Sequence, residues 1–149
     1  MAKKFQFRLA TLLKIRTHEV DRLQRELAAI LQRKAEVEHQ LLHYRQRLET
    51  EAGQFEKHPP HSIHELETRW HYLRRLQMEL DTLEQHYQYL VEQEAHCRQQ
   101  LTAALQRQRS LEKLKERKQQ EYQHLLQQQE QQQMDEISQR RHSQNKPKE

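Results

Sequence analysis

Two adjacent prolines near the middle of the chain, Pro59 and Pro60, constrain its fold more than any other feature. Proline lacks a backbone N–H and pushes the preceding residue out of the helical conformation, so a helix has to end just before them. Ser62, followed three residues later by Glu65, has the pattern of a capping box that starts a new helix. The rest of the chain has one glycine and one further proline. We therefore expect a hairpin of two long helices with its bend at residues 58–61.

The composition is too polar for a globular core. Only 34% of the residues are hydrophobic, 32% are charged, and the mean hydropathy is -1.28. Such a chain is either disordered or a coiled coil, which needs only a narrow apolar seam. No apolar run is long enough for a transmembrane span or a signal peptide, which predicts a cytoplasmic protein. Cys97 is the only cysteine, so neither a disulfide within the chain nor a cysteine metal site is expected.

Apolar residues that step by three and four along both halves favour the coiled coil over disorder. The predicted seam before the prolines is Leu9, Leu13, Arg16, Val20, Leu23, Leu27, Ile30, Lys34, Val37, Leu41, Tyr44, Leu48, Glu51 and Phe55. After them it is Leu66, Arg69, Leu73, Leu76, Leu80, Leu83, Tyr87, Leu90, Glu94, Cys97, Leu101, Ala104, Gln108 and Leu111. The predicted fold is all-α, a long antiparallel two-helix coiled-coil hairpin. Its expected parts are a coiled-coil region 1–137, with helices 5–57 and 62–137, and a disordered polar tail 138–149.

The antiparallel arrangement also predicts which seam residues face each other, because the numbers of facing residues must have a nearly constant sum. Lys34 then lies along the ring of Tyr87, where the lysine stem can pack while its ammonium stays in water. Other layers that can be checked are Leu23–Cys97, Glu51–Arg69, and two that join an apolar to a polar side chain, Leu27–Glu94 and Leu13–Gln108.

Two basic segments meet at the end of the predicted hairpin that lies away from the bend. Residues 1–16 hold five cations and no acid, a net charge of +5, and residues 107–118 have a net charge of +4. Such a concentration of charge favours either an acidic partner or a merely solvated basic face. Residues 1–16 alone could also form a mitochondrial presequence or a membrane-surface helix. Their pattern continues without a break into the first helix, which favours an ordinary helix start.

No pattern in the chain predicts catalysis, a cofactor or a metal site. With one glycine the chain cannot form a glycine-rich phosphate loop, and its carboxylates are scattered over solvated positions. His58, His61 and His64 are spaced by three, a spacing that can hold a metal ion. They flank prolines and have no cysteine or carboxylate group beside them, so solvated histidines are the better interpretation.

Aromatic residues gather in the half of the predicted hairpin near the bend. On a thin two-helix structure such a cluster is a plausible docking patch. Its members are Tyr44, Trp70, Tyr72, Tyr87 and Tyr89.

Motifs near the two ends of the chain resemble those of the flagellar FliJ family. Residues 5–16, FQFRLATLLKIR, are similar to its F-x-F-R-L-x-x-L-L-x-x-R opening. Residues 111–122, LEKLKERKQQEY, are similar to its L-E-K-L-K-E-R-x-x-x-E-Y segment, and residues 134–137, MDEI, to its terminal signature. The order and spacing of the three matches also agree with the family.

The resemblance implies a stalk component of the flagellar type III export apparatus, located at the cytoplasmic side of the inner membrane. Its implied partners are the hexameric export ATPase, whose ring it helps to assemble, the cytoplasmic domain of the membrane export gate, and export chaperones. In the stalk analogy the basic end enters the ATPase ring, and the aromatic patch is left for the gate. The expected ATPase-binding residues are Phe7, Arg8, Leu12, Arg16, Lys113, Leu114, Arg117 and Tyr122.

Three other functions are compatible with the residues. The stalk protein of a virulence-type secretion system would have the same architecture. A structural coiled-coil scaffold would affect no ATPase. A nucleic-acid-binding protein would use the basic end, but no basic helix precedes a parallel zipper here, so no nucleic-acid partner is predicted.

Overall fold

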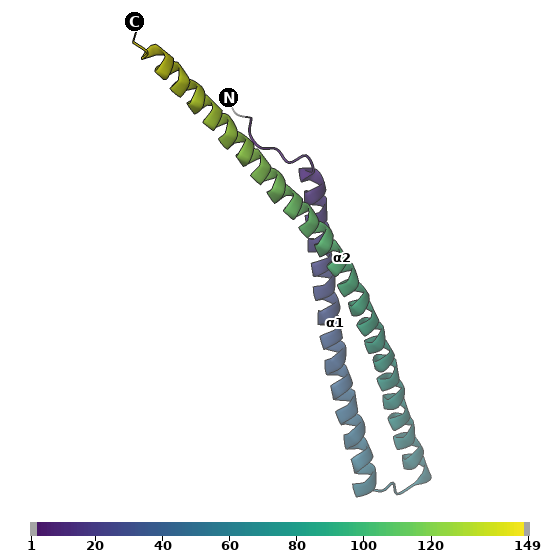
Figure 1. Ribbon diagram of the computed structural model, residues 1–149. Coiled ribbons are helices and arrows are strands. Elements are labelled where there is room, and N and C mark those ends of the chain that lie inside the picture. The colour runs from purple at the N-terminus through teal and green to yellow at the C-terminus, as the bar shows by residue number, and fades with distance from the viewer. Residues whose placement is uncertain (1–2, 148–149) are drawn as a thin grey trace. The chain divides into compact units, whose positions relative to one another are not determined.

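The structure, a computed structural model, describes residues 3–147 and contains two helices (Figure 1). Helix α1 is Ala10–Lys57 and helix α2 is Ile63–Gln144. Residues 3–147 contain no strand, and the predicted all-α helical hairpin is confirmed. The contacts divide the chain into two compact units, which are described separately. The hairpin unit is residues 21–103, and the terminal unit is the described part of residues 1–20 together with that of residues 104–149.

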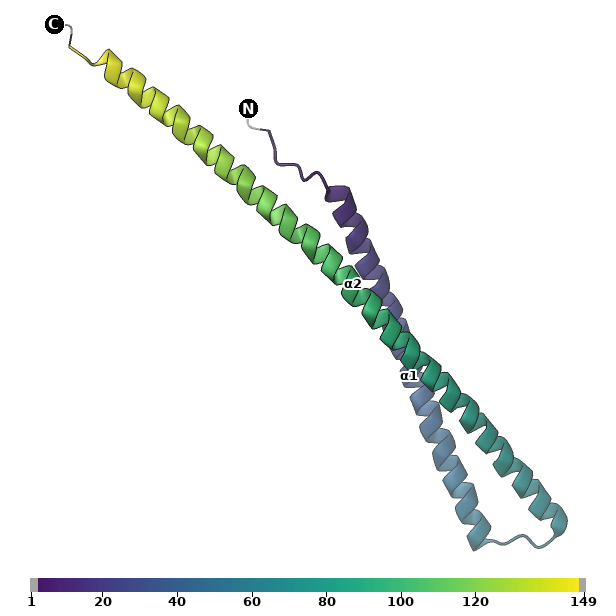
Figure 2. The ribbon, with the colours of Figure 1, turned by 45° about the vertical axis from the view of Figure 1, so that its right-hand side comes forward.

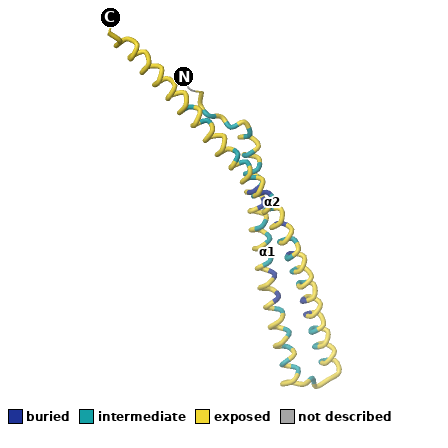
Figure 3. The backbone as a smooth tube through the Cα atoms, viewed as in Figure 1, coloured by how far each residue is buried: buried dark blue, intermediate teal, exposed yellow. Residues whose placement is uncertain are grey.

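In the hairpin unit the two helices lie side by side and antiparallel (Figures 1 and 2). Their buried positions are on the sides that face each other (Figure 3). A core cluster of Val37, Leu41, Leu80 and Leu90 packs against partly buried tyrosines and leucines. All the buried hydrophobic residues of the two units belong to the predicted seam: Val20, Leu23, Val37, Leu41, Leu76, Leu80, Leu90, Cys97 and Ala104. The heptad pattern therefore located the core of each unit.

Two contacts confirm the predicted register. The ammonium nitrogen of Lys34 lies 5.7 Å from the ring centroid of Tyr87. The buried thiol of Cys97 donates to the backbone carbonyl of Leu23, with sulfur and oxygen 3.6 Å apart. Burial raises the pKa of this thiol, because the thiolate would lose its hydration.

Glu94, predicted to face Leu27, bridges two cations. Its carboxylate oxygens lie 2.9 Å from Lys34 Nζ and 2.9 Å from an Arg98 guanidinium nitrogen. The hydrogen bond from Lys34, with that from Arg98, lowers the pKa of the Glu94 carboxyl. The same bond raises the pKa of Lys34. A charged residue is tolerated at the edge of this seam because both of its oxygens are paired.

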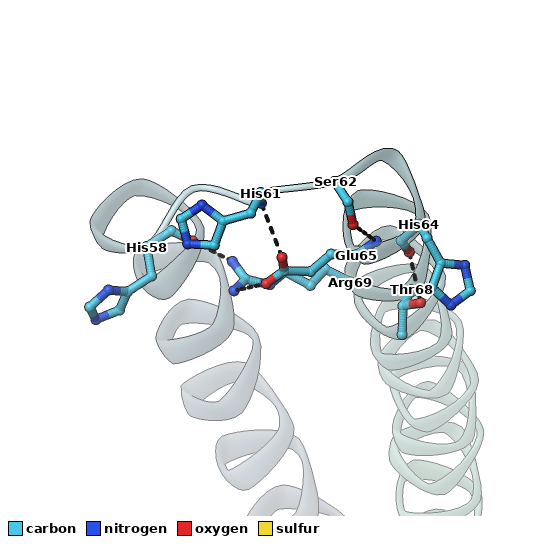
Figure 4. A network of polar contacts seen from close by, with 7 residues as sticks. All are labelled: His58, His61, Ser62, His64, Glu65, Thr68 and Arg69. Atoms are coloured by element: carbon cyan, nitrogen blue, oxygen red, sulfur yellow. Dashed lines mark hydrogen bonds and ion pairs between the residues drawn. The ribbon is translucent and has the colours of Figure 1, made fainter.

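The predicted capping box is present at the bend (Figure 4). The Ser62 hydroxyl oxygen accepts a hydrogen bond from the Glu65 backbone N–H at 3.1 Å. The Glu65 carboxylate accepts one from the His61 N–H at 3.0 Å. Two N–H groups that a helix start would leave without partners are thereby satisfied. The bond from His61, followed by the nearby Arg69, lowers the pKa of Glu65.

This capping box makes the start of α2 pH-sensitive. Because the folded pKa of Glu65 lies below its unfolded value of about 4.3, its stabilisation is complete above that value. It is lost as the pH falls through the folded pKa. Glu65→Gln can keep the hydrogen bond to His61 but carries no charge, so the variant should lose less stability than the parent between pH 6 and 3. Thermal unfolding followed by circular dichroism checks this, and equal losses would contradict it.

Arg69 was predicted to face Glu51, but the two residues form no ion pair within residues 3–147. Its guanidinium pairs with Glu65 at 2.9 Å, donates to the carbonyl of His58, and lies 5.9 Å from the ring centroid of Phe55. Glu65 is one turn earlier on the same helix, and the carbonyl lies just after the end of α1, where helices leave acceptors without partners. These nearer acceptors prevail over the cross-seam carboxylate.

Two helix boundaries also differ from those predicted. Helix α1 begins at Ala10 rather than at residue 5, after a turn closed by a 3.1 Å hydrogen bond from Ala10 N–H to the Phe7 carbonyl. Helix α2 continues to Gln144 instead of ending at residue 137, so much of the predicted disordered tail is helical. No glycine or proline lies between residue 137 and Pro147, so the backbone has no reason to leave the helix earlier.

Gly53, the only glycine, lies inside α1 and has no positive φ. A Cβ added there would have no atom within 4 Å. We expect Gly53→Ala to raise the free energy of unfolding by about 0.5–1 kcal/mol, because alanine loses less backbone entropy in a helix. Urea unfolding measures the change, and a destabilised variant would show that the position needs glycine.

Candidate functional site

The chain that precedes α1 lies along α2 in the terminal unit (Figures 1 and 2). The ring centroids of Phe5 and Tyr122 are 5.6 Å apart, and the Tyr122 hydroxyl donates to the backbone carbonyl of Lys3. Both side chains bury part of their apolar surface in this contact. It holds residues 5–7 outside the helix that the sequence pattern predicted.

A groove of about 520 Å³ runs between this segment and α2. We call it the terminal groove. Its apolar lining is Phe5, Phe7, Leu9, Leu114, Tyr122 and Leu125, and the charged side chains beside them are Lys4, Arg8, Lys118 and Glu121. Four of the predicted ATPase-binding residues line it, namely Phe7, Arg8, Leu114 and Tyr122. The structure thus joins the two end motifs of the chain in one groove with an apolar floor and a basic rim.

The other four predicted residues lie outside the terminal groove. Lys113 and Arg117 are exposed one turn apart on α2 and make no ion pair within residues 3–147. Leu12 is 37% exposed. Arg16 is half-buried and pairs with Glu19 at 3.1 Å, so its charge is used inside the protein.

Polar contacts join α1 and α2 in the terminal unit near residues 17–19 and 107–108. Glu19 also faces Arg107 at 3.6 Å. The side-chain amide of Gln108, predicted to face Leu13, donates to the Thr17 hydroxyl at 3.2 Å. The polar side chain in that layer therefore has a partner.

Phe5 and Leu125 line the terminal groove but were not among the predicted ATPase-binding residues. Outside the groove, Ile15 is 56% exposed beside the seam of α1 and was not predicted either. Leu125 lies three residues after Tyr122, a spacing that places both on one side of a helix and could have revealed it. Phe5 is part of the opening motif, but its contact with Tyr122 could not be predicted because it joins residues that are distant in the sequence.

The five predicted gate-binding aromatics do not form one patch in the hairpin unit. Tyr44 lines a groove with Gln40 and Met78, and its hydroxyl bonds to Glu79, which raises the pKa of Tyr44. Tyr87 and Tyr89 line a separate groove. Tyr72 lies beside Arg75, which also lines the groove of Tyr44, and Trp70 lies beside Arg74.

Arginines cover the aromatic faces near the bend. Arg74 lies 5.2 Å from the Trp70 centroid, and Arg47 and Arg75 lie 5.8 and 5.5 Å from that of Tyr72. Trp70 and Tyr89 are the most accessible of the five aromatics, at 52% and 56% exposed. The surface around Trp70 and Tyr72 is therefore both aromatic and cationic, whereas the surface around Tyr89 is not.

The histidines at the bend are not arranged as a metal site. The imidazole of His64 points away from those of His58 and His61 (Figure 4). Nowhere in residues 3–147 do three or more histidine, cysteine, aspartate or glutamate side chains gather in a way that could hold a metal ion. Over the same residues, neither helix combines the length and apolarity that crossing a bilayer requires.

Comparison with known proteins identifies the family. The sequence model described as "Flagellar FliJ protein" matches residues 5–147, a range that includes the whole hairpin unit and all of the terminal groove except Lys4. No curated protein and no solved structure shows significant similarity to the chain. The family match covers nearly all of the sequence and includes both end motifs. The chain therefore belongs to the flagellar FliJ family, which serves flagellar protein export as a non-catalytic component.

Proposed function

We propose that the protein is the stalk of the flagellar type III export apparatus and binds the hexameric export ATPase through its terminal unit. The observation that carries this proposal is the terminal groove, where both end motifs of the family meet. Its apolar floor and basic rim have the composition of a protein interface, an apolar centre within a charged margin. The two exposed cations Lys113 and Arg117 extend the positive potential along α2 and would speed the encounter with an acidic ring.

The hairpin unit is proposed to bind the cytoplasmic domain of the membrane export gate. Exposed Trp70 and Tyr89 are the residue types that most often dominate binding energy at protein interfaces. Because Tyr44 lines one groove and Tyr87 and Tyr89 line another, gate binding at either groove would involve only some of the five aromatics. Export chaperones are further proposed partners. The protein is proposed to act at the cytoplasmic side of the inner membrane, at the base of the flagellum.

Titration of the full chain into its cognate export ATPase tests the proposed function. We expect a complex in isothermal titration calorimetry, more ATPase rings in analytical ultracentrifugation, and weaker binding as salt screens the basic rim. Random-sequence DNA at physiological salt is the control partner and should not bind. Absence of an ATPase complex at low salt, or tighter binding to DNA, would contradict the proposal.

A further inference from the structure

A groove of about 930 Å³ on the hairpin unit lies between α1 and α2 beside the core cluster. We call it the acidic groove. Leu42 and Tyr89, which lie outside the predicted seam, contribute large apolar side chains to its lining. They are 55% and 56% exposed, so most of this apolar surface is in contact with water. Burying it would be favourable in proportion to its area.

The rim of the acidic groove is negatively charged. Glu38, Asp81, Glu84 and Glu92 line it, against a single cation, Arg45. Arg45 pairs with Glu84 at 3.2 Å, and the Tyr87 hydroxyl donates to Glu38 at 2.9 Å. Asp81 accepts a hydrogen bond from the Gln77 side-chain amide at 2.9 Å, and neither Asp81 nor Glu92 has an ion pair within residues 3–147, so no cation neutralises their charges there.

This groove is distinct from the one that contains Tyr44. The two share no lining residue. On α1 one is lined by residues 38, 41, 42 and 45 and the other by residues 40 and 44. With about 100° of rotation per helical residue, these sets lie on different sides of the seam.

We propose that the acidic groove binds an amphipathic helix of a partner protein, whose apolar face is flanked by lysine and arginine. A groove between two packed helices suits a third helix, which would cover Leu42 and Tyr89 by ridge-into-groove packing. The uncompensated carboxylates select basic flanks and disfavour acidic ones. Nucleic acid and anionic lipid would be repelled by the same rim.

This inference goes beyond the proposed function, because it specifies the kind of helix that binds the acidic groove and not which protein carries that helix. It rests on the proposed function only in that Tyr87 and Tyr89 also belong to the proposed gate-binding surface. The basic segment of a second copy of this chain is the rival occupant, and the test includes it.

The probe is an alanine-rich helical peptide of about 20 residues, with leucines along one face and lysines on both flanks of that face. Its matched control has glutamate at every lysine position. We expect fluorescence anisotropy with the full chain to show saturable binding of the lysine peptide and at least tenfold weaker binding of the glutamate peptide. Equal binding of both peptides, or of neither, would overturn the proposal.

Two variants of the chain locate the peptide. Leu42→Ser/Tyr89→Ser removes the apolar lining, and Asp81→Lys/Glu92→Lys reverses the free charges; each should weaken lysine-peptide binding about tenfold or more. The controls Met78→Ser and Glu67→Lys change an exposed apolar and an exposed acidic residue outside the groove and should bind as the parent does. Equal losses in the controls would show nonspecific attraction and overturn the site.

Two further measurements separate this inference from its alternatives. In sedimentation equilibrium we expect the parent and Asp81→Lys/Glu92→Lys to show the same association state. If the parent self-associates and the variant does not, the occupant is a second copy of the chain and the proposal is wrong. The charge variant is also tested against the gate domain. If the charge variant loses the peptide but still binds the gate domain, the acidic groove is a peptide site and the gate binds elsewhere. If it loses the gate domain but still binds the peptide, the proposed peptide site is wrong and the proposed function is not affected.

Discussion

Replacing Leu90 by alanine is expected to lower the free energy of unfolding by about 3 kcal/mol. Leu90 is 1% exposed, the most deeply buried leucine of the core cluster, and packs with Val37, Leu41 and Leu80. The substitution removes apolar contacts and leaves a cavity that α1 and α2, already in contact on both sides of it, can close only partly. Urea unfolding followed by circular dichroism measures the loss.

The matched control is Leu42→Ala, which truncates a leucine beside the same cluster that is 55% exposed. Its effect should stay within about 0.5 kcal/mol, because little buried surface is lost. If the two substitutions cost the same, the seam would not be the main source of stability in the hairpin unit.

Reversing the charges of Arg8 and Arg117 to glutamate is expected to weaken binding to the export ATPase by roughly 100-fold at low salt. Arg8 lines the terminal groove, and Arg117 is exposed on α2 without an ion pair in residues 3–147. Each reversal removes an attraction and adds a repulsion toward an acidic partner. Neither residue is on the seam, so the helix content measured by circular dichroism should be unchanged.

Arg140→Glu/Arg141→Glu provides the control for this double reversal. Both residues are exposed on α2 and outside the terminal groove, and their reversal changes the net charge by the same amount. The control should bind the ATPase within about threefold of the parent, because Arg140 lies 15 residues beyond Leu125, roughly 22 Å farther along α2 at about 1.5 Å per residue, and the Coulomb interaction falls with distance. If both double reversals weaken binding equally, net charge rather than the terminal groove determines affinity.

Sequence periodicity was enough to predict the seam, because a narrow apolar stripe is the only way for so polar a chain to bury a core. The register followed from the same rows, and the position of Lys34 over Tyr87 confirms it. Ser62 and Glu65 predicted the start of α2, since capping depends on neighbours in the sequence. Features that are local or strictly periodic were therefore accessible without a structure.

Features that depend on distant contacts were not accessible. The apolar pattern that includes Phe5 fits a helix, and only the contact with Tyr122 shows why that segment leaves the helix. Arg69 has several acceptors within reach, and the seam pattern could not rank the His58 carbonyl above Glu51. The aromatics clustered in sequence number but are distributed around the helix pair: Tyr44 lines one groove, whereas Tyr87 and Tyr89 line another.

The central claim is that separate surfaces of the protein bind the export ATPase and the gate. The most direct test of this two-surface account is one set of affinities, measured by one method in one buffer. Arg8→Glu/Arg117→Glu and Trp70→Ser/Tyr89→Ser are each titrated against the export ATPase and against the gate's cytoplasmic domain. The two-surface account predicts that the first variant loses the ATPase and keeps the gate, and that the second loses the gate and keeps the ATPase. Loss of both partners to the same extent in both variants would contradict it.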